Sequence, residues 1–188
     1  MIFNSIQFII FLPVVVILYY LLPFKYRWIL LLAASYYFYL CWNVNYIVLL
    51  LSSTIIDYVC AIMMDRYHNK RKKLLFLWIS AFSNFGMLFT FKYYNFFIDS
   101  INYSLNFFSI GSPIPFIEVL LPVGISFYIF QTFSYVVDVY QGNQKAEKHF
   151  GYFALYVTYF PQLVAGPIER YTSLAPQLQT KHTFEYKN

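Results

Sequence analysis

The chain has 188 residues, of which 60% are hydrophobic, 24% aromatic and only 11% charged. About a quarter of the residues of an ordinary soluble domain are charged, so this composition excludes a soluble globular protein and indicates an integral membrane protein. The excess of 13 basic over 8 acidic residues could suggest a nucleic-acid partner. In a membrane protein, however, the position of the basic residues matters more than their sum, and we expect no nucleic-acid binding.

The first apolar run covers residues 2–22 and is long enough to cross a bilayer. No basic residue precedes it and no cleavage site for a signal peptide follows it, so we interpret it as a retained first span that ends at Pro23. Residues 28–56 carry no charge and are long for one span but short for two. We favour a tight helical hairpin broken at residues 41–45 over a single long span.

Basic residues concentrate in the segment 65–73, DRYHNKRKK, and the hairpin would place Lys25 and Arg27 on the same side as this loop. The positive-inside rule assigns that side to the cytoplasm. A nucleic-acid patch is the alternative interpretation, but a topology anchor explains the loop without further assumption. Two cysteines, Cys41 and Cys60, lack the spacing or histidine partners of a metal or redox site. We expect both to be small buried packing residues, and we expect no metal site.

Residues 74–91 form the next expected span. Four polar residues recur on one side of it at helical spacing, as expected for a face that packs on other helices: Ser80, Ser83, Asn84 and Thr90. Residues 95–115 are rich in Asn, Ser, Gly and Pro, and their only charge is Asp99. This composition predicts an irregular segment on the outer side of the membrane.

Residues 120–142 predict a charge-poor helix with a polar side. Five residues fall within an arc of roughly 80° at about 100° per residue: Gly124, Tyr128, Gln131, Tyr135 and Asp138. The opposite side suits lipid and contains Ile125, Ile129, Phe130, Phe133, Val136 and Val137. Polar groups at membrane depth are costly unless they face protein or a water-filled cavity. We interpret the helix as a cavity wall lined by Tyr128, Gln131 and Asp138. A purely structural role for Gln131 and Asp138 is the alternative.

The uncharged run 150–168 contains Pro161, Gly166 and Pro167. These residues predict a broken or re-entrant segment, because irregular backbone at membrane depth must be buried in protein or line a cavity. Gln162 and Arg170 are further cavity-lining candidates, since a terminal arginine beside a broken helix could bind an anionic group. The alternative is a kinked span with Arg170 at the level of the lipid headgroups.

Asp57 is expected within the membrane or at its edge, where a carboxylate is a candidate functional residue. A structural bond to a neighbouring helix, or a side chain that reaches the interface, is the alternative. The three histidines, His68, His149 and His182, all lie in expected loops or in the tail. Acyl transfer to a hydroxyl usually needs a base such as histidine, so the chain shows no catalytic residue within an expected span.

Five blocks in order along the chain resemble the membrane-bound O-acyltransferase family, in its alginate O-acetyltransferase-like branch: SSTIIDY (52–58), FKYYNFF (91–97), LPVGISFYIFQTFSYVVDVYQG (121–142), FPQLVAGPIER (160–170) and LAPQL (174–178). The resemblance implies that residues 1–188 are the N-terminal portion of a single transmembrane domain, without a separate soluble domain. The implied fold is an all-α, multi-span bundle with about five to six membrane segments in this part, within a larger protein of the bacterial inner membrane.

The resemblance further implies that an acyl group, usually acetyl, passes from a cytoplasmic donor toward an extracytoplasmic polymer such as alginate. The donor, acetyl-CoA or an acyl carrier, would be a substrate and not a bound cofactor. The partners implied are membrane lipid, the donor, and an extracytoplasmic acyltransferase or the polysaccharide acceptor. The family's catalytic histidine belongs to a later helix that none of the three histidines here matches, so we expect this portion to be incomplete as a catalyst. A transporter or channel-like subunit and a non-catalytic scaffold are the alternatives.

Overall fold

The computed structural model describes residues 4–42, 44–108, 112, 114–116, 124–163, 166–167 and 169–181. All regular secondary structure in this part of the chain is helical, which confirms the all-α class. Two helical runs are long and apolar enough to cross a membrane by length and composition, Ile47–Arg66 and Lys70–Phe107. The expected number of five to six membrane segments stays a prediction.

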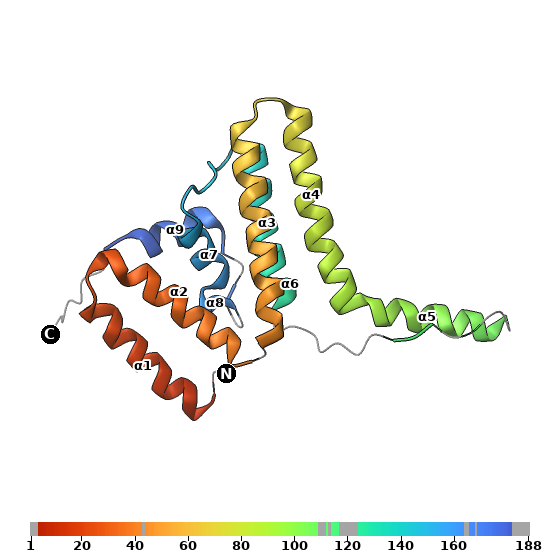
Figure 1. Cartoon of the computed structure of the whole chain (residues 1–188), viewed down its shortest axis with the longest axis horizontal. Helices are drawn as coiled ribbons and strands as arrows, with labels where there is room; N and C mark the ends of the chain where they lie inside the picture. Colours follow the sequence, from red (N-terminus) through yellow and green to blue (C-terminus); the bar gives the residue numbers. More distant parts are fainter. Residues whose placement is uncertain are drawn as a thin grey trace.

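Three helices stand side by side in one half of the molecule: α3 (Ile47–Arg66), α4 (Lys70–Leu88) and α6 (Ile125–Gln141) (Figure 1). A short turn joins the antiparallel α3 and α4, and Asn69 caps α4 because its side-chain oxygen accepts a hydrogen bond of 2.9 Å from the Arg71 amide. The non-helical loop is therefore shorter than the expected basic segment 65–73. Arg66 belongs to the end of α3, and the lysines and arginine after Asn69 form the first turn of α4.

The helix expected over residues 120–142 is confirmed for its described part, and residues 120–123 lie outside the described residues. Helix α6 begins after Gly124 and ends before Gly142, at φ angles of 74° and 80°. This left-handed region is one that glycine adopts without the steric cost of a Cβ. The two glycines thus delimit α6 at 17 residues.

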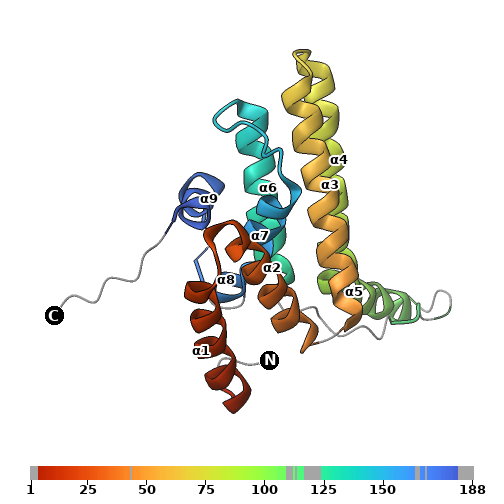
Figure 2. The same cartoon turned by 60° about the vertical axis from the view of Figure 1, so that its left-hand side comes forward.

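Helices α1 (Ile6–Leu21) and α2 (Phe24–Leu40) form an antiparallel pair in the other half of the molecule (Figure 2). The predicted break at Pro23 is confirmed, since α1 ends before it and α2 starts after it. Only Val15 of α1 is buried, as expected for a helix that meets lipid on most sides.

The predicted break after α2 is also confirmed, because only a short 3₁₀ turn, Val44–Tyr46, separates α2 from α3. The expectation that α2 and α3 pack against each other as a tight hairpin is wrong. Few contacts join these two helices; α3 packs mainly on α4 and α6, and α2 packs on α7. The expectation for the cysteines holds for Cys60, which is buried, and is wrong for Cys41, which is exposed at the end of α2.

The predicted broken segment is confirmed. Helix α7 (Phe150–Thr158) stops at Tyr159, a short α8 (Phe160–Leu163) follows, and α9 (Tyr171–Gln179) comes after residues 164–170. Tyr159 has the extended ψ angle of 108°, and Pro161 has no amide hydrogen with which to continue α7. The freed amide of Phe160 donates instead to Ser35 Oγ of α2 at 3.2 Å.

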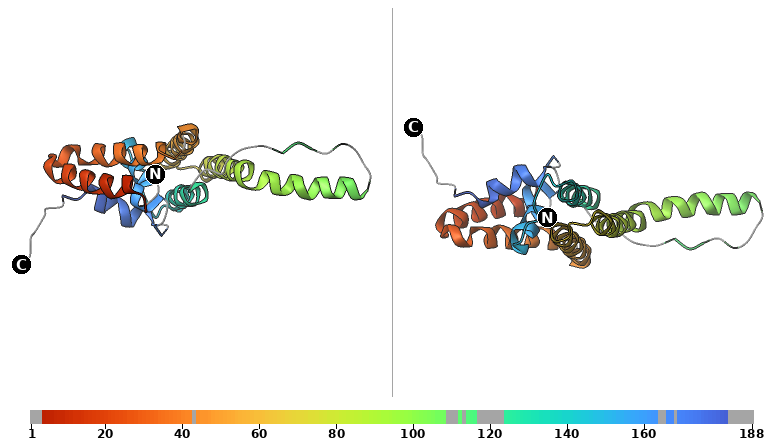
Figure 3. Two further views of the ribbon diagram at one scale, coloured as in Figure 1. Left: turned by 90° about the horizontal axis from the view of Figure 1, so that it is seen from below. Right: turned by 90° about the horizontal axis from the view of Figure 1, so that it is seen from above.

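The expectation of an irregular segment over residues 95–115 is wrong for residues 95–107, which are helical. Helix α4 continues through a π-helical turn, Phe89–Tyr93, into α5 (Tyr94–Phe107), which leaves the body of the molecule at a wide angle (Figure 3). The reason is periodicity: apolar residues recur at helical spacing along this stretch, and that pattern outweighs the weak helix propensity of its Asn and Ser residues.

Helices α2 and α7 approach each other closely at Gly151. A Cβ at this position would lie 2.3 Å from Cζ3 and 2.8 Å from Cη2 of Trp28. The Trp28 ring also packs edge-on against His149, with centroids 4.9 Å apart. Any side chain at position 151 therefore displaces the indole that joins the two helices.

We predict that Gly151→Ala lowers the free energy of unfolding in detergent micelles by roughly 1–3 kcal/mol, as overpacking does. Gly86→Ala is the matched control, because nothing lies within 4 Å of its Cβ position and alanine is the better helix former. Gly86→Ala should be neutral or stabilising. Equal effects of the two substitutions would contradict the close approach, and Trp28→Leu should partly rescue Gly151→Ala.

Candidate functional site

Asp57 lies fully buried where α3, α4 and α6 meet. Its carboxylate accepts a hydrogen bond of 2.6 Å from Ser80 Oγ and bonds of 2.8 and 2.9 Å from Asn84 Nδ2. The buried Thr132 of α6 lies beside this carboxylate, and its hydroxyl donates to the Ile129 carbonyl of its own helix at 3.2 Å. We call these four residues, Asp57, Ser80, Asn84 and Thr132, the Asp57 cluster.

The cluster has the arrangement that a carboxylate needs inside an apolar bundle, because a buried charge is costly unless it is hydrogen-bonded. Ser80 and Asn84 are four residues apart and therefore share one face of α4, which confirms the packing role predicted for them. Of the other two residues of that expected face, Ser83 is half-buried and Thr90 is exposed. The carboxylate thus makes the structural bonds that the sequence left as one alternative for Asp57.

The polar side of α6 is buried in protein at Tyr128, Gln131 and Tyr135, and Asp138 is half-buried. The opposite side was expected to face lipid, which is wrong for Ile125, Ile129 and Val136, all of them buried; Phe130 is exposed. The reason is the position of α6, which packs on α3 and α4 on one side and on α7 on the other.

Tyr156 of α7 connects the polar side of α6 to the segment before α9. Gln131 Nε2 donates to the Tyr156 carbonyl at 3.1 Å. The Tyr156 hydroxyl donates to the carbonyl of Glu169 at 3.1 Å, with the Gln131 carbonyl 3.4 Å away. The structure therefore brings Gln131 close to the residue that precedes Arg170.

Two of the candidate residues carry buried polar atoms without a hydrogen-bond partner among the described residues: Tyr128 Oη and Gln162 Oε1. Gln162 is 6% exposed, and its amide nitrogen donates to the Pro167 carbonyl at 2.8 Å. A Cβ on Gly166 would lie 2.8 Å from Cα of Gln162, so this glycine allows the turn that holds Gln162 in place. Only a small minority of buried polar atoms in native structures lack a partner.

The remaining two candidates lie nearer the surface. The backbone carbonyl of Asp138 accepts hydrogen bonds from the amides of Asn143 and Gln144 at 3.0 and 3.3 Å and so closes the end of α6. Arg170 is exposed at the N-cap position of α9. A mainly apolar cavity of about 360 Å³ between α1, α2, α8 and α9 contains none of the five candidates. Their role as cavity-lining residues stays a prediction.

Glu147 is a connecting residue that the sequence reasoning missed. Its carboxylate accepts hydrogen bonds from the Tyr171 hydroxyl at 2.5 Å, from Gln179 Nε2 at 3.3 Å and from the His149 amide at 2.7 Å. Its own amide donates to Tyr135 Oη at 2.8 Å. Burial raises the pKa of the Tyr171 phenol, and the bond to Glu147 raises it further, so the phenol remains a donor. The sequence did contain one indication of this role, because Glu147 is the only acidic residue in the otherwise basic segment 145–149.

The histidines have local roles where they are described. His68 lies in the α3–α4 turn, and His149 caps α7 by accepting a hydrogen bond from the Tyr152 amide on Nδ1 at 3.3 Å. His182 lies outside the described residues.

The described part of the chain is all-helical and has two helical runs long and apolar enough to cross a membrane, and the comparisons with known proteins specify its relatives. The chain is 39% identical over 189 residues to a probable alginate O-acetylase from Pseudomonas syringae pv. tomato, covering 98% of this chain and 36% of that protein. It is 36% identical over 188 residues to a probable alginate O-acetylase from Azotobacter vinelandii, covering 98% of this chain and 38% of that protein. A peptidoglycan O-acetyltransferase from Helicobacter pylori is 30% identical over 222 residues, which cover 100% of this chain and 41% of that protein.

The chain is therefore homologous to the N-terminal part of the alginate O-acetylases and is related to the peptidoglycan O-acetyltransferase. It spans less than half the length of these relatives. No protein-family model matches the chain, and no solved structure matches it significantly.

We predict that Asp57→Ala lowers the free energy of unfolding in detergent micelles by roughly 2–4 kcal/mol, because it leaves buried donors of Ser80 and Asn84 unpaired. Asp57→Asn should be milder, since its carbonyl still accepts from Ser80 and the unpartnered Asn84 Oδ1 can turn to accept from the new amide. Asp65→Ala is the control on the same helix; its side chain is exposed, and a change within about 0.5 kcal/mol is expected. Similar losses for Asp57→Ala and Asp65→Ala would refute the cluster.

Proposed function

We propose that this chain forms the N-terminal part of a bacterial inner-membrane O-acyltransferase. In that protein an acyl group, most simply acetyl, passes from a cytoplasmic donor to an extracytoplasmic polysaccharide such as alginate. The observation that carries the proposal is relatedness to O-acetylases over 98% of the chain. The peptidoglycan O-acetyltransferase relative supports the transfer of acetyl to a polymer and leaves the acceptor to experiment.

The distribution of charge supports the orientation that this reaction needs. Arg66 and the run Lys70–Lys73 gather at the α3–α4 turn, and Lys25 and Arg27 lie in the first turn of α2. Under the positive-inside rule these ends face the cytoplasm. The opposite end of the α3–α4–α6 unit, where α6 begins, then faces the extracytoplasmic side.

The unpartnered atoms support a transfer path beside α6. Tyr128 Oη lies near the start of α6, and Gln162 Oε1 lies in the broken segment. Buried polar groups in native structures are paired with protein or with ordered water. In the proposed path, water or a hydroxyl of the substrate satisfies these two atoms. The Gln131–Tyr156 bonds hold the wall between them in a fixed geometry.

Arg170 is the residue best placed to meet an anionic donor. Its exposed guanidinium stands at the N-terminus of α9, where the helix dipole also favours negative charge. A phosphate or carboxylate can accept two parallel hydrogen bonds from the planar fork of an arginine. In this proposal Arg170 binds and orients the donor and takes no part in breaking its acyl bond.

A chimera tests the proposed function. The matching N-terminal part of the Pseudomonas syringae relative is replaced by this chain, and the acetyl content of alginate is measured in cells that lack the native protein. We expect acetylation to be retained at a substantial fraction of the native level. A chimera that reaches the membrane in normal amount but acetylates neither alginate nor peptidoglycan would contradict the proposal.

We predict that Tyr128→Phe in the chimera lowers acyl transfer several-fold while leaving the membrane abundance and thermal stability unchanged or improved. The substitution removes only an unpaired hydroxyl, so a purely structural role predicts no loss. Tyr103→Phe, on the exposed part of α5, is the matched control and should have no effect. Full activity of Tyr128→Phe would show that the Tyr128 hydroxyl does not contribute to the proposed path.

Arg170→Lys should lower transfer by about tenfold, because an ammonium cannot replace two parallel bonds from a planar fork. Saturation with donor should recover part of the loss. Arg71→Lys, an exposed residue in the first turn of α4, is the control and should leave transfer unchanged. Unchanged activity of Arg170→Lys would exclude a two-bond contact with the donor.

A further inference from the structure

The length of α4 places its two ends at the two surfaces of a bilayer. After the basic first turn of α4, the uncharged run Leu74–Phe91 has 18 residues and ends within the π-helical turn. At about 1.5 Å each these residues rise by about 27 Å, which matches a hydrocarbon core of about 30 Å. The basic α3–α4 turn lies at one end, and the π-helical turn Phe89–Tyr93 lies at the other. Helix α5 therefore begins where α4 reaches the second interface.

The π-helical turn redirects the chain at that point. Figures 1 and 3 show α5 running away from the body as a separate arm, at a wide angle to α4. Its main contacts with other elements are with the π-helical turn itself. A helix that leaves a membrane span at such an angle lies close to the plane of the membrane surface.

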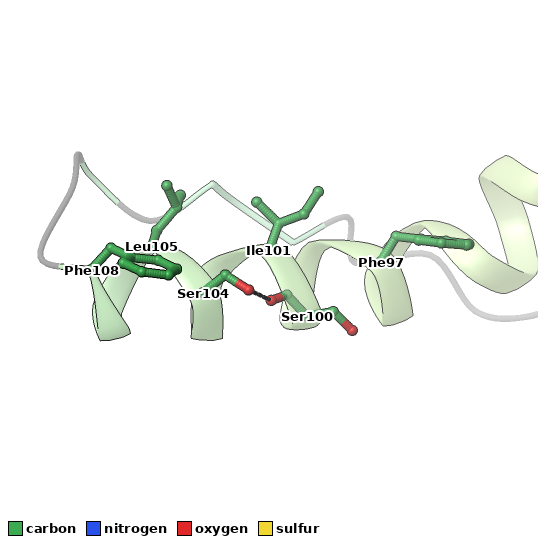
Figure 4. A pocket seen from close by; sticks show the side chains of 6 residues that line it. All are labelled: Phe97, Ser100, Ile101, Ser104, Leu105 and Phe108. Carbon is green, nitrogen blue, oxygen red and sulfur yellow. Dashed lines mark hydrogen bonds between the residues drawn. The ribbon is translucent and has the colours of Figure 1, made fainter.

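Helix α5 is amphipathic, with a narrow polar strip on one side and an apolar surface around the rest of its axis. A narrow polar strip contains Asn95, Asp99, Asn102 and Asn106, which fall within about 60° at 100° per residue. The remaining surface carries mainly aromatic and aliphatic side chains. Figure 4 shows the shallow hollow of about 280 Å³ on this apolar side, which is lined by Phe97, Ser100, Ile101, Ser104, Leu105 and Phe108.

The two serines of the apolar side and the buried Asn102 of the polar strip are already paired. Ser100 Oγ donates to the Phe96 carbonyl and Ser104 Oγ donates to the Ser100 carbonyl, each at 3.0 Å. The Asn102 side chain donates to the Ile114 carbonyl at 2.9 Å and accepts from the Ile114 amide at 2.8 Å, which satisfies the backbone of the segment beside α5. Hydrocarbon tolerates such a surface, because its polar groups are satisfied internally.

An aromatic surface continues from α4 onto α5 across the bend. Trp78 and Phe82 project from α4 with 64% and 83% of their surfaces exposed, and Phe89 lies seven residues further along the same side. The Phe89 ring packs against Phe97 of α5 with centroids 5.2 Å apart. The apolar side of α5 is thus continuous with the side of α4 that is exposed in the described part of the chain.

We propose that α5 is an in-plane interfacial helix, whose apolar side inserts into the lipid leaflet opposite the basic α3–α4 turn and whose exposed polar residues Asp99 and Asn106 face water. Phospholipid acyl chains are the occupant of the hollow. The continuity with the exposed aromatic side of α4 favours lipid over a protein partner, and α5 lacks the Lys and Arg residues that an acidic protein surface would select. The proposal is independent of acyl transfer. It fixes the depth at which α4 ends and the chain returns toward α6.

Site-directed spin labelling tests this placement in the full chain, reconstituted in phosphatidylethanolamine–phosphatidylglycerol vesicles. Labels are attached one at a time to Phe97→Cys, Ile101→Cys and Phe108→Cys on the apolar side. Asp99→Cys and Asn106→Cys on the polar strip are the matched controls. The background carries Cys41→Ser, and the native Cys60 is buried. All five labelled positions are exposed, so the labels do not disturb the packed core.

We expect labels at 97, 101 and 108 to collide several-fold more often with oxygen than with a water-soluble nickel chelate, and labels at 99 and 106 to show the reverse. Free access of the chelate to all five positions would overturn the proposal. So would slow motion with shielding from both reagents at 97, 101 and 108, because that result signifies a protein surface on α5. Thermal midpoints equal to that of the background confirm that each variant is folded.

Discussion

The Asp57 carboxylate is fully buried, and its need for hydrogen-bond donors organises the unit formed by α3, α4 and α6. Ser80 and Asn84 supply those donors from one face of α4, and the buried Thr132 of α6 lies beside the carboxylate. In lipid, apolar side chains gain little by choosing one helix over another, so polar contacts and close packing decide which helices pair. The hydrogen bonds of the cluster therefore join α3 to α4, while α6 packs on both helices and α2 packs on α7.

This pairing gives α6 two different surroundings. The side of Thr132 faces the cluster, and the side of Gln131 faces α7, where the Tyr156 bonds connect it to the segment before Arg170. The second half of the molecule is fixed by other means: the close approach at Gly151, the Phe160 amide bonded to Ser35, and Glu147. The Glu147 amide bonds to Tyr135 of α6, and its carboxylate accepts from the His149 amide before α7 and from Tyr171 of α9. Tyr128 Oη and Gln162 Oε1, which have no hydrogen-bond partner among the described residues, are the polar lining of the proposed acyl-transfer path.

The sequence predicted those features that depend on neighbouring residues. Pro23 and Pro161 indicated where helices break, the uncharged runs indicated apolar helices, and the five ordered blocks indicated the O-acetylase relatives. The α2–α3 pairing failed because the choice of neighbour depends on Asp57, Ser80 and Asn84, whose partnership spans 23 to 27 residues. Helix α5 was missed because composition was weighed above periodicity.

The candidate site was predicted only in its local pattern. The polar side of α6 was visible at helical spacing, whereas its burial and its bonds to Tyr156 depend on α7, which is 25 residues away. Glu147 was missed because its partners Tyr171 and Gln179 lie 24 and 32 residues further on. Contacts of this kind follow from helix packing and have no periodic signal of their own.

A double-mutant cycle on the Asp57 cluster tests most directly whether this carboxylate organises the helices. The free energy of unfolding in detergent micelles is measured for the unmodified chain, Asp57→Ala, Asn84→Ala and the double variant. If the two side chains stabilise the fold through each other, the cycle gives a coupling of about 1–3 kcal/mol. Losses that add to within about 0.5 kcal/mol would show that each residue acts alone, and would contradict the account.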